Sequence, residues 1–501
     1  MTWWLWIILA AAASTVAVAL YDITQKSHAI LRNFPLVGHL RYLLESAGPE
    51  LRQYVVADND EELPFSRDQR RWVYASAKSD NAYFGFGTDN DITAEGYVFL
   101  RQAAFPAIDP SPDSPIPCTK ILGGWRGRAK AFRPSSIINT SAMSFGSLSG
   151  PAVEAINRGV ALAGCWQNTG EGGISVHHRQ GGDLMFQIGT GYFGARDSDG
   201  RFSIDAVLAS IEGAPVKAIE IKLSQGAKPG LGGVLPASKV TAEISAARGV
   251  PVGVTVHSPS RHSEFDDVDQ LIEFVERIAD ATGLPVGIKS AIGEEEFWHD
   301  LAARMAATGR GPDFVTVDGG EGGTGAAPST FSDHVSLPFR NAFPVVYQAF
   351  AAHDLHEKIV FFGSGRLGFA TDAMVAMSMG VDMINVAREA MLAIGCIQAQ
   401  RCHTGHCPTG VATHNRWLTR GLDPTDKGVR LGSYVGALHH ELRSLAHAMG
   451  ATHPALVDPT RVEFRSGTGD LVKVHDALGI DTALFDSNHR ARLSEMLADP
   501  V

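Results

Sequence analysis

The chain has 501 residues, of which 45% are hydrophobic and 19% are charged, as in ordinary globular proteins. Its net charge of −11 argues against a nucleic-acid-binding surface. Five cysteines in a chain of this length are not the disulfide framework of a small secreted protein. Three of the five lie within twelve residues of one another, which directs attention to metal binding.

The first predicted element is an apolar segment over residues 3–20 that contains no charged residue. Its length is just enough to cross a hydrocarbon core of about 30 Å, so we expect residues 1–21 to form a transmembrane anchor. A cleaved signal peptide is the main alternative, but it should begin with basic residues, and none precedes Trp3. Because Lys26, Arg32 and Arg41 follow the segment, the positive-inside rule predicts a single-pass protein of the inner (plasma) membrane with its catalytic domain in the cytoplasm.

The next predicted elements are a supporting region over residues 22–129, with a helix near residues 39–45, and then an alternation of strands and helices over 130–450. Eight such strands predict a closed parallel sheet, the (β/α)₈ TIM barrel of the α/β class. The predicted strands are 137–143, 166–169, 218–223, 252–258, 285–291, 314–320, 359–365 and 382–388. An open doubly wound sheet is the alternative, but the first strand lacks the G-x-G-x-x-G turn that a dinucleotide-binding sheet would need. Residues 451–501 are predicted to be a helical tail.

Polar residues and glycines follow the predicted strands, where barrel enzymes place their catalytic groups. Gly363-Ser-Gly-Arg366 and Ala387-Arg388 follow the last two strands, and both loops suit a phosphate group. Gly322-Gly-Thr-Gly-Ala326 offers further exposed backbone nearby. Lys289 ends an apolar strand, where it either stabilises negative charge on a flavin ring or forms a structural ion pair with a carboxylate.

The strongest metal-binding pattern is Cys396-x₅-Cys402-x₄-Cys407-Pro408. Thiolates at this spacing can converge on an iron–sulfur cluster, and a proline after the last cysteine recurs in such loops. Zinc is the alternative, with His403 or His406 as a fourth ligand, although structural zinc sites usually have more closely spaced cysteine pairs. Cys118 and Cys165 are isolated and are expected to be core residues.

Five motifs now occur together and in order: Ser141-Ala-Met-Ser-Phe-Gly, Asn168-Thr-Gly-Glu-Gly-Gly, Gln225-Gly-Ala-Lys-Pro-Gly, Gly322-Gly-Thr-Gly-Ala and the cysteine loop. Over residues 130–450 the chain resembles the FMN-binding synthase domain of the glutamate synthase large subunit. The full length resembles the stand-alone bacterial members of that family. The resemblance implies FMN, a 3Fe-4S cluster on Cys396, Cys402 and Cys407, and reduction of 2-iminoglutarate, formed from 2-oxoglutarate and ammonia, to L-glutamate.

The resemblance also implies roles for individual residues. It places Ser141, Ala142, Met143, Asn168 and Lys289 at the flavin ring, and Gly323, Thr324, Gly365 and Arg366 at its phosphate. Arg388 belongs to the second phosphate loop described above. Glu171, Lys228 and Arg248 occupy the positions that hold the oxoacid in the family, and two cations suit a dicarboxylate. Arg248 lies on a predicted helix, so a plain surface position is its alternative.

The chain departs from the family pattern in two respects. Val234 stands where the family has a glutamine that contacts the substrate, which favours a looser or different oxoacid. No glutaminase or nicotinamide-binding domain is recognisable, so we expect ammonia to come free or from a separate glutaminase. Electrons would come from an external donor such as ferredoxin or a reductase subunit. The alternatives are an FMN-dependent dehydrogenase, a glutamate N-methyl transfer enzyme, and an electron-relay subunit that turns over no substrate.

Overall fold

The computed structural model describes residues 3–58, 60–83, 85, 87–108 and 115–499. The chain divides into two compact units, residues 1–70 and 71–501. This division lies inside the segment 22–129 that the sequence predicts as one supporting region.

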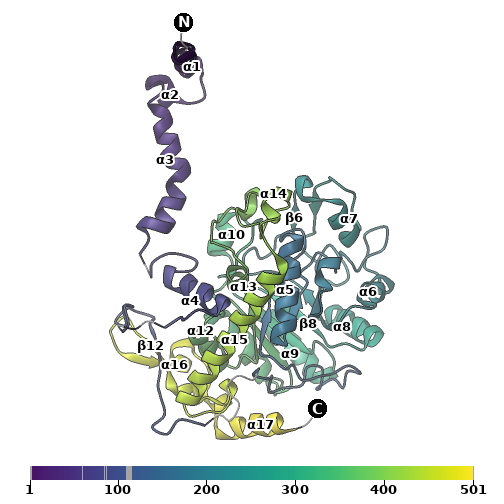
Figure 1. Ribbon diagram of the computed structural model, residues 1–501. Helices are drawn as coiled ribbons and strands as arrows, with labels where there is room; N and C mark the ends of the chain where they lie inside the picture. Colours follow the sequence, from purple (N-terminus) through teal and green to yellow (C-terminus); the bar gives the residue numbers. More distant parts are fainter. Residues whose placement is uncertain (1–2, 59, 84, 86, 109–114, 500–501) are drawn as a thin grey trace. The chain divides into compact units, whose positions relative to one another are not determined.

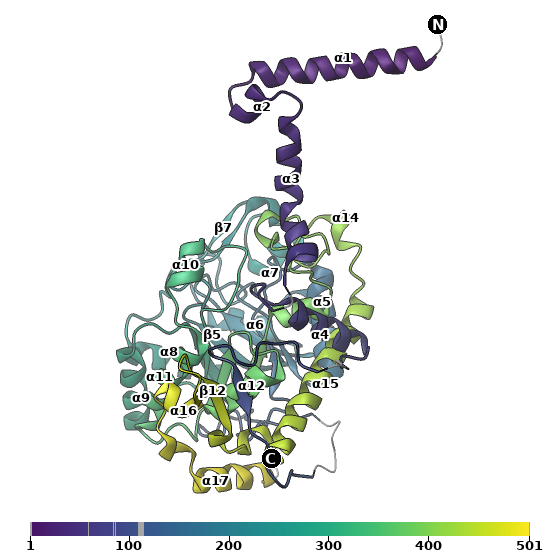
Figure 2. The ribbon, with the colours of Figure 1, turned by 90° about the vertical axis from the view of Figure 1, so that its left-hand side faces the viewer.

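The first unit is built from three helices, α1 (Trp3–Thr24), α2 (Ala29–Asn33) and α3 (Gly38–Leu51), followed by a short π-helix over Arg52–Val56. Among the described residues, α1 is the one helix that is long and apolar enough to cross a membrane, and a signal sequence would pass the same test. The turn between α1 and α3 is held by Asp22, which accepts hydrogen bonds from the Leu36 backbone N–H (2.9 Å) and from His39 Nε2 (2.9 Å). Figure 2 shows α1 and α3 running in different directions on either side of this turn.

The second unit contains a closed barrel of eight parallel strands, which confirms the predicted TIM barrel. In barrel order the strands are β2 (Ile138–Thr140), β3 (Trp166–Asn168), β4 (Asp183–Ile188), β5 (Val216–Lys222), β8 (Val286–Ser290), β9 (Phe314–Asp318), β10 (Val360–Ser364) and β11 (Met383–Val386). Seven of them coincide with predicted strands. The prediction missed β4, because only a single 3₁₀ turn (Val176–His178) separates it from β3 and the expected alternation with helices breaks there.

The predicted strand 252–258 was wrong as a barrel strand. Within it, only Val256–His257 forms a strand, β7, which pairs antiparallel with β6 (Val234–Leu235) outside the barrel. Both strands belong to an excursion between β5 and β8 that also contains α7 (Ala242–Arg248). This excursion carries Lys228, Val234 and Arg248.

Helices surround the barrel, and their ends follow ordinary capping chemistry. The Ser149 side chain caps α5 (Gly150–Ala163), the Asp267 side chain caps α8 (Val268–Thr282), and glycines with positive φ end both helices. The long helix α15 (Pro424–Ala448) packs along α5 (Figure 1). The remaining helices are α4 (Arg67–Lys78), α6 (Ile204–Ile211), α9 (Glu296–Thr308), α10 (Ser329–His334), α11 (Phe339–Ala351), α12 (Ala370–Ser378), α13 (Arg388–Ala393) and α14 (Arg416–Thr419).

The segment after residue 451 is more than the predicted helical tail. It contains the strands β12 (Val462–Arg465) and β13 (Leu471–Lys473) as well as the helices α16 (Val474–Leu478) and α17 (Ser487–Ala498). β12 pairs with β13 on one side and with β1 (Val98–Leu100) on the other, so the two ends of the second unit share a small sheet.

Candidate active site

Two barrel strands end in a buried ion pair. Lys289, in β8, places its Nζ 3.5 Å from Asp318 Oδ2 at the end of β9. The same carboxylate oxygen accepts the Gly226 backbone N–H at 2.9 Å. Lys289 is therefore a cation fixed at the carboxyl-terminal rim of the barrel. Lys289 thus forms an ion pair with a carboxylate, which the sequence analysis gave as the alternative to a role at the flavin ring.

A second ion pair lies at the same rim. Lys222, the last residue of β5, donates from Nζ to Glu171 Oε1 at 3.0 Å and to Gln225 Oε1 at 3.2 Å. Burial alone would raise the pKa of Glu171, but the positive charges of Lys222, Lys228 and Arg248 outweigh it and lower that pKa. Glu171 is thus held as a carboxylate.

Lys228 and Arg248 are buried cations that form no ion pair with a carboxylate in the described part of the chain. Lys228 is 4% exposed and donates from Nζ to the Gly232 carbonyl at 3.0 Å. Arg248 is 6% exposed and donates from Nη2 to the Phe145 carbonyl at 3.1 Å. Burial lowers the pKa of both groups, and repulsion from Lys222 lowers that of Lys228 further. Two such cations favour an anionic ligand, whose charge would offset their desolvation.

Arg248 is the last residue of α7, and its burial excludes the surface position that the sequence left open. Its guanidinium lies 5.1 Å from the centre of the Phe193 ring. A Cβ on Gly146 or Gly172 would approach its Nη2 to 3.0 and 3.1 Å, so both glycines make room for it.

Val234, in contrast, is 45% exposed in β6, where a side chain is free to reach a ligand or solvent.

The Asn168 side chain is directed into the barrel rather than toward these cations. Its Nδ2 donates to Glu220 Oε1 at 2.7 Å, and its Oδ1 accepts the Gly170 N–H at 3.0 Å. Gln187 and Thr316 donate to the same buried Glu220 carboxylate, each at 2.7 Å. A flavin contact by the Asn168 amide would require it to leave Glu220.

The segment Ser141–Met143 directly follows β2, and all three residues lie at the rim. The Ser141 backbone N–H donates to the Val386 carbonyl at 2.7 Å, which fixes the segment against β11. A Cβ on Gly170 would come within 2.6 Å of the Ser144 nitrogen, so the loops after β2 and β3 touch at that glycine.

The predicted phosphate loops lie together after β9, β10 and β11. A Cβ on Gly365 would lie 2.7 Å from Phe339 Cβ, so only glycine fits there, and Arg366 adopts a left-handed φ of 57°. Arg388 donates from Nη2 to the Glu321 carbonyl, and a Cβ on Gly323 would lie 3.5 Å from its Cδ. Burial lowers the pKa of Arg388. Thr324, beside Gly323, is exposed.

The cysteine loop follows α13 and has an unusual backbone. Gln398 and Gln400 have positive φ values of 55° and 53°, which is costly for residues other than glycine and typical of functional loops. Burial raises the pKa of the Cys396 thiol to about 12, and negative charge on Cys402 and Cys407 would raise it further. Three thiolates therefore need a metal cation to share this loop.

The structure bears on the zinc alternative for the cysteine loop. Tetrahedral zinc holds its sulfur ligands roughly 4 Å apart. Among the described residues, the cysteine sulfurs do not form a set lying within 4.8 Å of one another. His403 and His406, the expected fourth ligands of a zinc site, are both exposed.

The cysteine loop lies beside the predicted phosphate loops. A Cβ on Gly325 would approach the Cys402 backbone to 3.1 Å. Lys239 donates from Nζ to the Cys402 carbonyl at 3.3 Å, and Tyr74 donates from its hydroxyl to the Cys396 carbonyl at 2.9 Å. These two residues escaped prediction because they approach from distant parts of the chain. The pairing of Asp318 with Lys289 could have been predicted, because the two residues lie at the ends of the neighbouring strands β9 and β8. The pairing of Lys222 with Glu171 could not, because β4 lies between their strands.

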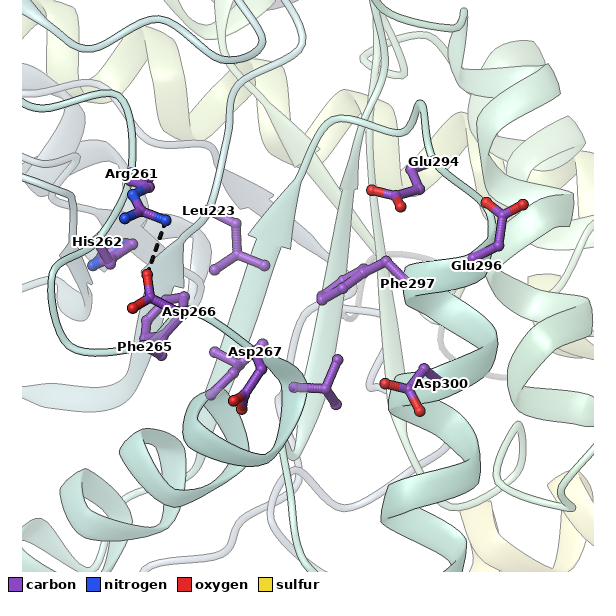
Figure 3. Close-up of a pocket in the computed structure, with 12 residues that line it drawn as sticks. Leu223, Arg261, His262, Phe265, Asp266, Asp267, Glu294, Glu296, Phe297 and Asp300 are labelled. Carbon is purple, nitrogen blue, oxygen red and sulfur yellow. Dashed lines mark ion pairs between the residues drawn. The ribbon is translucent and has the colours of Figure 1, made fainter.

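None of these residues lines a cavity of about 530 Å³ that lies beside the starts of α8 and α9 (Figure 3). Its walls carry five carboxylates, and its one arginine, Arg261, is paired with Asp266 at 2.8 Å. The carboxylates are Asp266, Asp267, Glu294, Glu296 and Asp300. Such a surface would repel a dicarboxylate, so this cavity is not the oxoacid site.

The model of the conserved region in glutamate synthase matches residues 127–452, which include the whole barrel and the cysteine loop. The chain belongs to the glutamate synthase family. A glutamate synthase large subunit-like protein of Bacillus subtilis, YerD, is 36% identical over 493 residues, covering 91% of this chain and 94% of that protein. The archaeal glutamate synthase (NADPH) of Methanocaldococcus jannaschii is 34% identical over 344 residues, and this match covers 68% of the chain and 64% of that protein.

Family membership makes the chain an oxidoreductase of the glutamate synthase-like type. Archaeal-type glutamate synthases from Thermotoga species match over only 58% of their own length. Among solved structures, mandelate oxidase with benzoyl-formic acid matches with a TM-score of 0.42 and 17% identity, covering 74% of this chain and 87% of that one. That likeness is too distant to bear on the chemistry.

Proposed function

We propose that the chain is a membrane-anchored oxidoreductase that converts 2-oxoglutarate, or a close oxoacid, and ammonia to L-glutamate, using FMN and a 3Fe-4S cluster. The proposal rests on one observation: Lys228 and Arg248 are buried without carboxylate partners beside the ionised Glu171. A dicarboxylic oxoacid offers two negative charges that match the two cations. The ammonia is supplied free or by a separate glutaminase.

Each residue around the oxoacid would have a distinct task. Lys228 Nζ and the Arg248 guanidinium would bind the two carboxylates and orient the reacting carbon. Lys222 keeps Glu171 in place through the 3.0 Å ion pair. Glu171, as an ionised carboxylate, would accept a hydrogen bond from the substrate nitrogen. Because both cations are buried, water is largely excluded and their interactions with the substrate are strengthened.

Ser141, Ala142, Met143, Asn168 and Lys289 would hold the FMN ring, and Gly323, Thr324, Gly365, Arg366 and Arg388 would hold its phosphate. The residues fit this group, since packing against Phe339 restricts position 365 to glycine, which leaves the loop backbone there without a side chain, and Arg388 lies at the same loops. FMN, when bound, supplies hydride transfer to the substrate. The fixed charge of Lys289 would stabilise negative charge on the ring.

Cys396, Cys402 and Cys407 would hold the cluster, which supplies one-electron transfer from an external donor such as ferredoxin or a reductase subunit. The strained loop and the contact of Gly325 with the Cys402 backbone support this assignment. The apolar, exposed helix α1 supports a single-pass anchor in the inner membrane with a cytoplasmic catalytic domain.

The test is glutamate formation by the purified full-length protein given 2-oxoglutarate, ammonia and reduced ferredoxin under anaerobic conditions. The Lys228→Met variant should lose this activity, and the control Lys217→Met, altered at a half-exposed lysine, should keep it. No glutamate from the wild type would reject the proposed substrate.

Because Val234 replaces a substrate-binding glutamine, the second candidate is a dehydrogenase or N-methyl transfer enzyme for another oxoacid or amine, and a panel of oxoacids would reveal it.

A further inference from the structure

Two histidines and one glutamate converge at the base of the barrel, at the end opposite to the rim. His356 and Glu357 lie in the turn between α11 and β10, and His489 lies in the first turns of α17. One ligand atom from each residue lies within 4.8 Å of the other two. His489 Nδ1 is 2.7 Å from Glu357 Oε1, and His356 Nε2 is 4.0 Å from the same oxygen.

His356 is the unexplained member of this group. It is only 9% exposed, yet its Nδ1 has no hydrogen-bond partner among the described residues. Its Nε2 faces the Glu357 carboxylate at a distance too long for a hydrogen bond. Buried polar groups normally have a partner. A cation between the ring and the carboxylate would give Nε2 a partner, and Nδ1 would stay without one.

The two imidazoles are buried side by side, since His356 is 9% exposed and His489 is 6% exposed. The two rings lie nearly parallel, 24° apart in plane with centres separated by 6.2 Å.

Arg492 occupies the place where a cation would approach Glu357. Its Nη2 lies 2.6 Å from Oε1 and its Nε lies 2.8 Å from Oε2. The Arg492 side chain is 49% exposed, so it can turn into solvent at little cost. The nearby Lys120 does not compete, because its Nζ is bound to Asp382 at 2.8 Å and to two backbone carbonyls.

We propose that His356, Glu357 and His489 form a binding site for a divalent transition-metal ion such as Zn²⁺, which binds in exchange for Arg492. Two imidazoles with one carboxylate favour zinc over calcium or magnesium, which prefer oxygen ligands alone. The bound ion would join α17 to the turn before β10 and so hold the end of the chain on the barrel base. This site is independent of the chemistry at the rim.

The test is calorimetric titration of the EDTA-treated full-length protein with ZnSO₄. Any Zn²⁺ bound by the cysteine loop contributes equally to the wild type and to His356→Gln. The difference in bound Zn²⁺ between the two proteins therefore reports this site alone. We expect one Zn²⁺ equivalent to be weakened by more than about tenfold in His356→Gln. Arg492→Gln should bind this equivalent about two- to fivefold more tightly, since a competing ion pair is removed. His299→Gln, at an exposed histidine of α9, should match the wild type.

His356→Gln loses no hydrogen bond seen in the structure but loses the ring contacts with Tyr347 and His489, so each variant's melting temperature in EDTA serves as its own baseline. Zn²⁺ should then raise the melting temperature of the wild type and of Arg492→Gln but not that of His356→Gln. Equal zinc binding by the wild type and His356→Gln would overturn the proposal. Weaker binding by Arg492→Gln would do so as well, because it would show that Arg492 and Glu357 serve only as a structural ion pair.

Discussion

The base and the rim of the barrel both contain buried cations, but they differ in whether these cations have carboxylate partners. At the base, Lys120 is bound to Asp382, and Arg128 is bound to Glu276 at 2.7 Å and to Asp313 at 3.0 Å. At the rim, Lys222 and Lys289 also have carboxylate partners, but Lys228 and Arg248 donate to backbone carbonyls instead.

The difference separates stability from binding. The carboxylate partner of a buried cation offsets the free-energy cost of removing both charges from water. Removing one partner leaves the other charge buried and unpaired, which destabilises the fold. A buried cation without such a partner costs free energy until a ligand brings negative charge. Lys228 and Arg248, the rim cations without a carboxylate partner, are therefore the ones placed for substrate. Substitutions of paired and unpaired cations should separate the two roles.

The largest effect is expected at the base. Lys120→Met leaves the Asp382 carboxylate buried without its cation, and we expect the free energy of unfolding to fall by about 3–5 kcal/mol. Urea unfolding followed by circular dichroism measures this loss. Lys217→Met removes a half-exposed lysine that lies 3.7 Å from Asp183, and it should cost less than about 1 kcal/mol. Similar losses in the two variants would contradict the proposed difference.

At the rim, replacing a buried lysine with methionine should weaken oxoacid binding rather than lower stability. Lys228→Met removes a buried cation with no carboxylate partner, so the free energy of unfolding should stay the same or rise. The dissociation constant for 2-oxoglutarate should increase by roughly tenfold or more, which is the loss of about 1.5–3 kcal/mol from one charged hydrogen bond. Calorimetry of oxoacid binding measures it, and a stability loss as large as that of Lys120→Met would place Lys228 with the base cations.

A buried histidine near the base should make the fold sensitive to acid. Burial lowers the pKa of His453 to about 4, whereas the unfolded chain binds this proton near pH 6.5. The stabilisation is therefore complete above pH 6.5 and is lost as the pH falls toward 4. Between pH 6.5 and 5 this loss is about 1.5 kcal/mol for one histidine, because the unfolded histidine is already half protonated at pH 6.5. His453→Gln should flatten the dependence of stability on pH by that amount, and an unchanged slope in urea unfolding would contradict it.

The smallest effect is expected at Val234. This residue is 45% exposed, so Val234→Gln should leave the melting temperature unchanged. If 2-oxoglutarate is the substrate, the added amide should tighten its binding by about 0.5–1.5 kcal/mol, the usual net value of one hydrogen bond. Weaker binding of 2-oxoglutarate together with unchanged stability would indicate a different oxoacid.

Much of the barrel could be predicted because buried parallel strands leave apolar runs followed by polar rim residues. The exceptions were β4, which no α-helix separates from β3, and the segment 252–258, whose strand belongs to a two-stranded antiparallel sheet outside the barrel. Both failures come from connections that interrupt the alternation of strands and helices.

The site was predictable where its residues stand in motifs. The positions of Lys289, Glu171 and Lys228 in the sequence gave their place at the rim, but not their partners. The direction of the Asn168 amide toward Glu220, and the approach of Lys239 to Cys402, depend on tertiary packing that no local pattern encodes.

The central claim is that one barrel holds a flavin beside iron bound by three thiolates. Visible absorbance combined with low-temperature electron paramagnetic resonance and metal analysis of anaerobically purified protein tests it most directly. We expect one FMN and about three iron atoms per chain. In Cys402→Ser the iron and its paramagnetic signal should be lost while the flavin remains. Protein without flavin, or with zinc in place of iron on the cysteine loop, would contradict it.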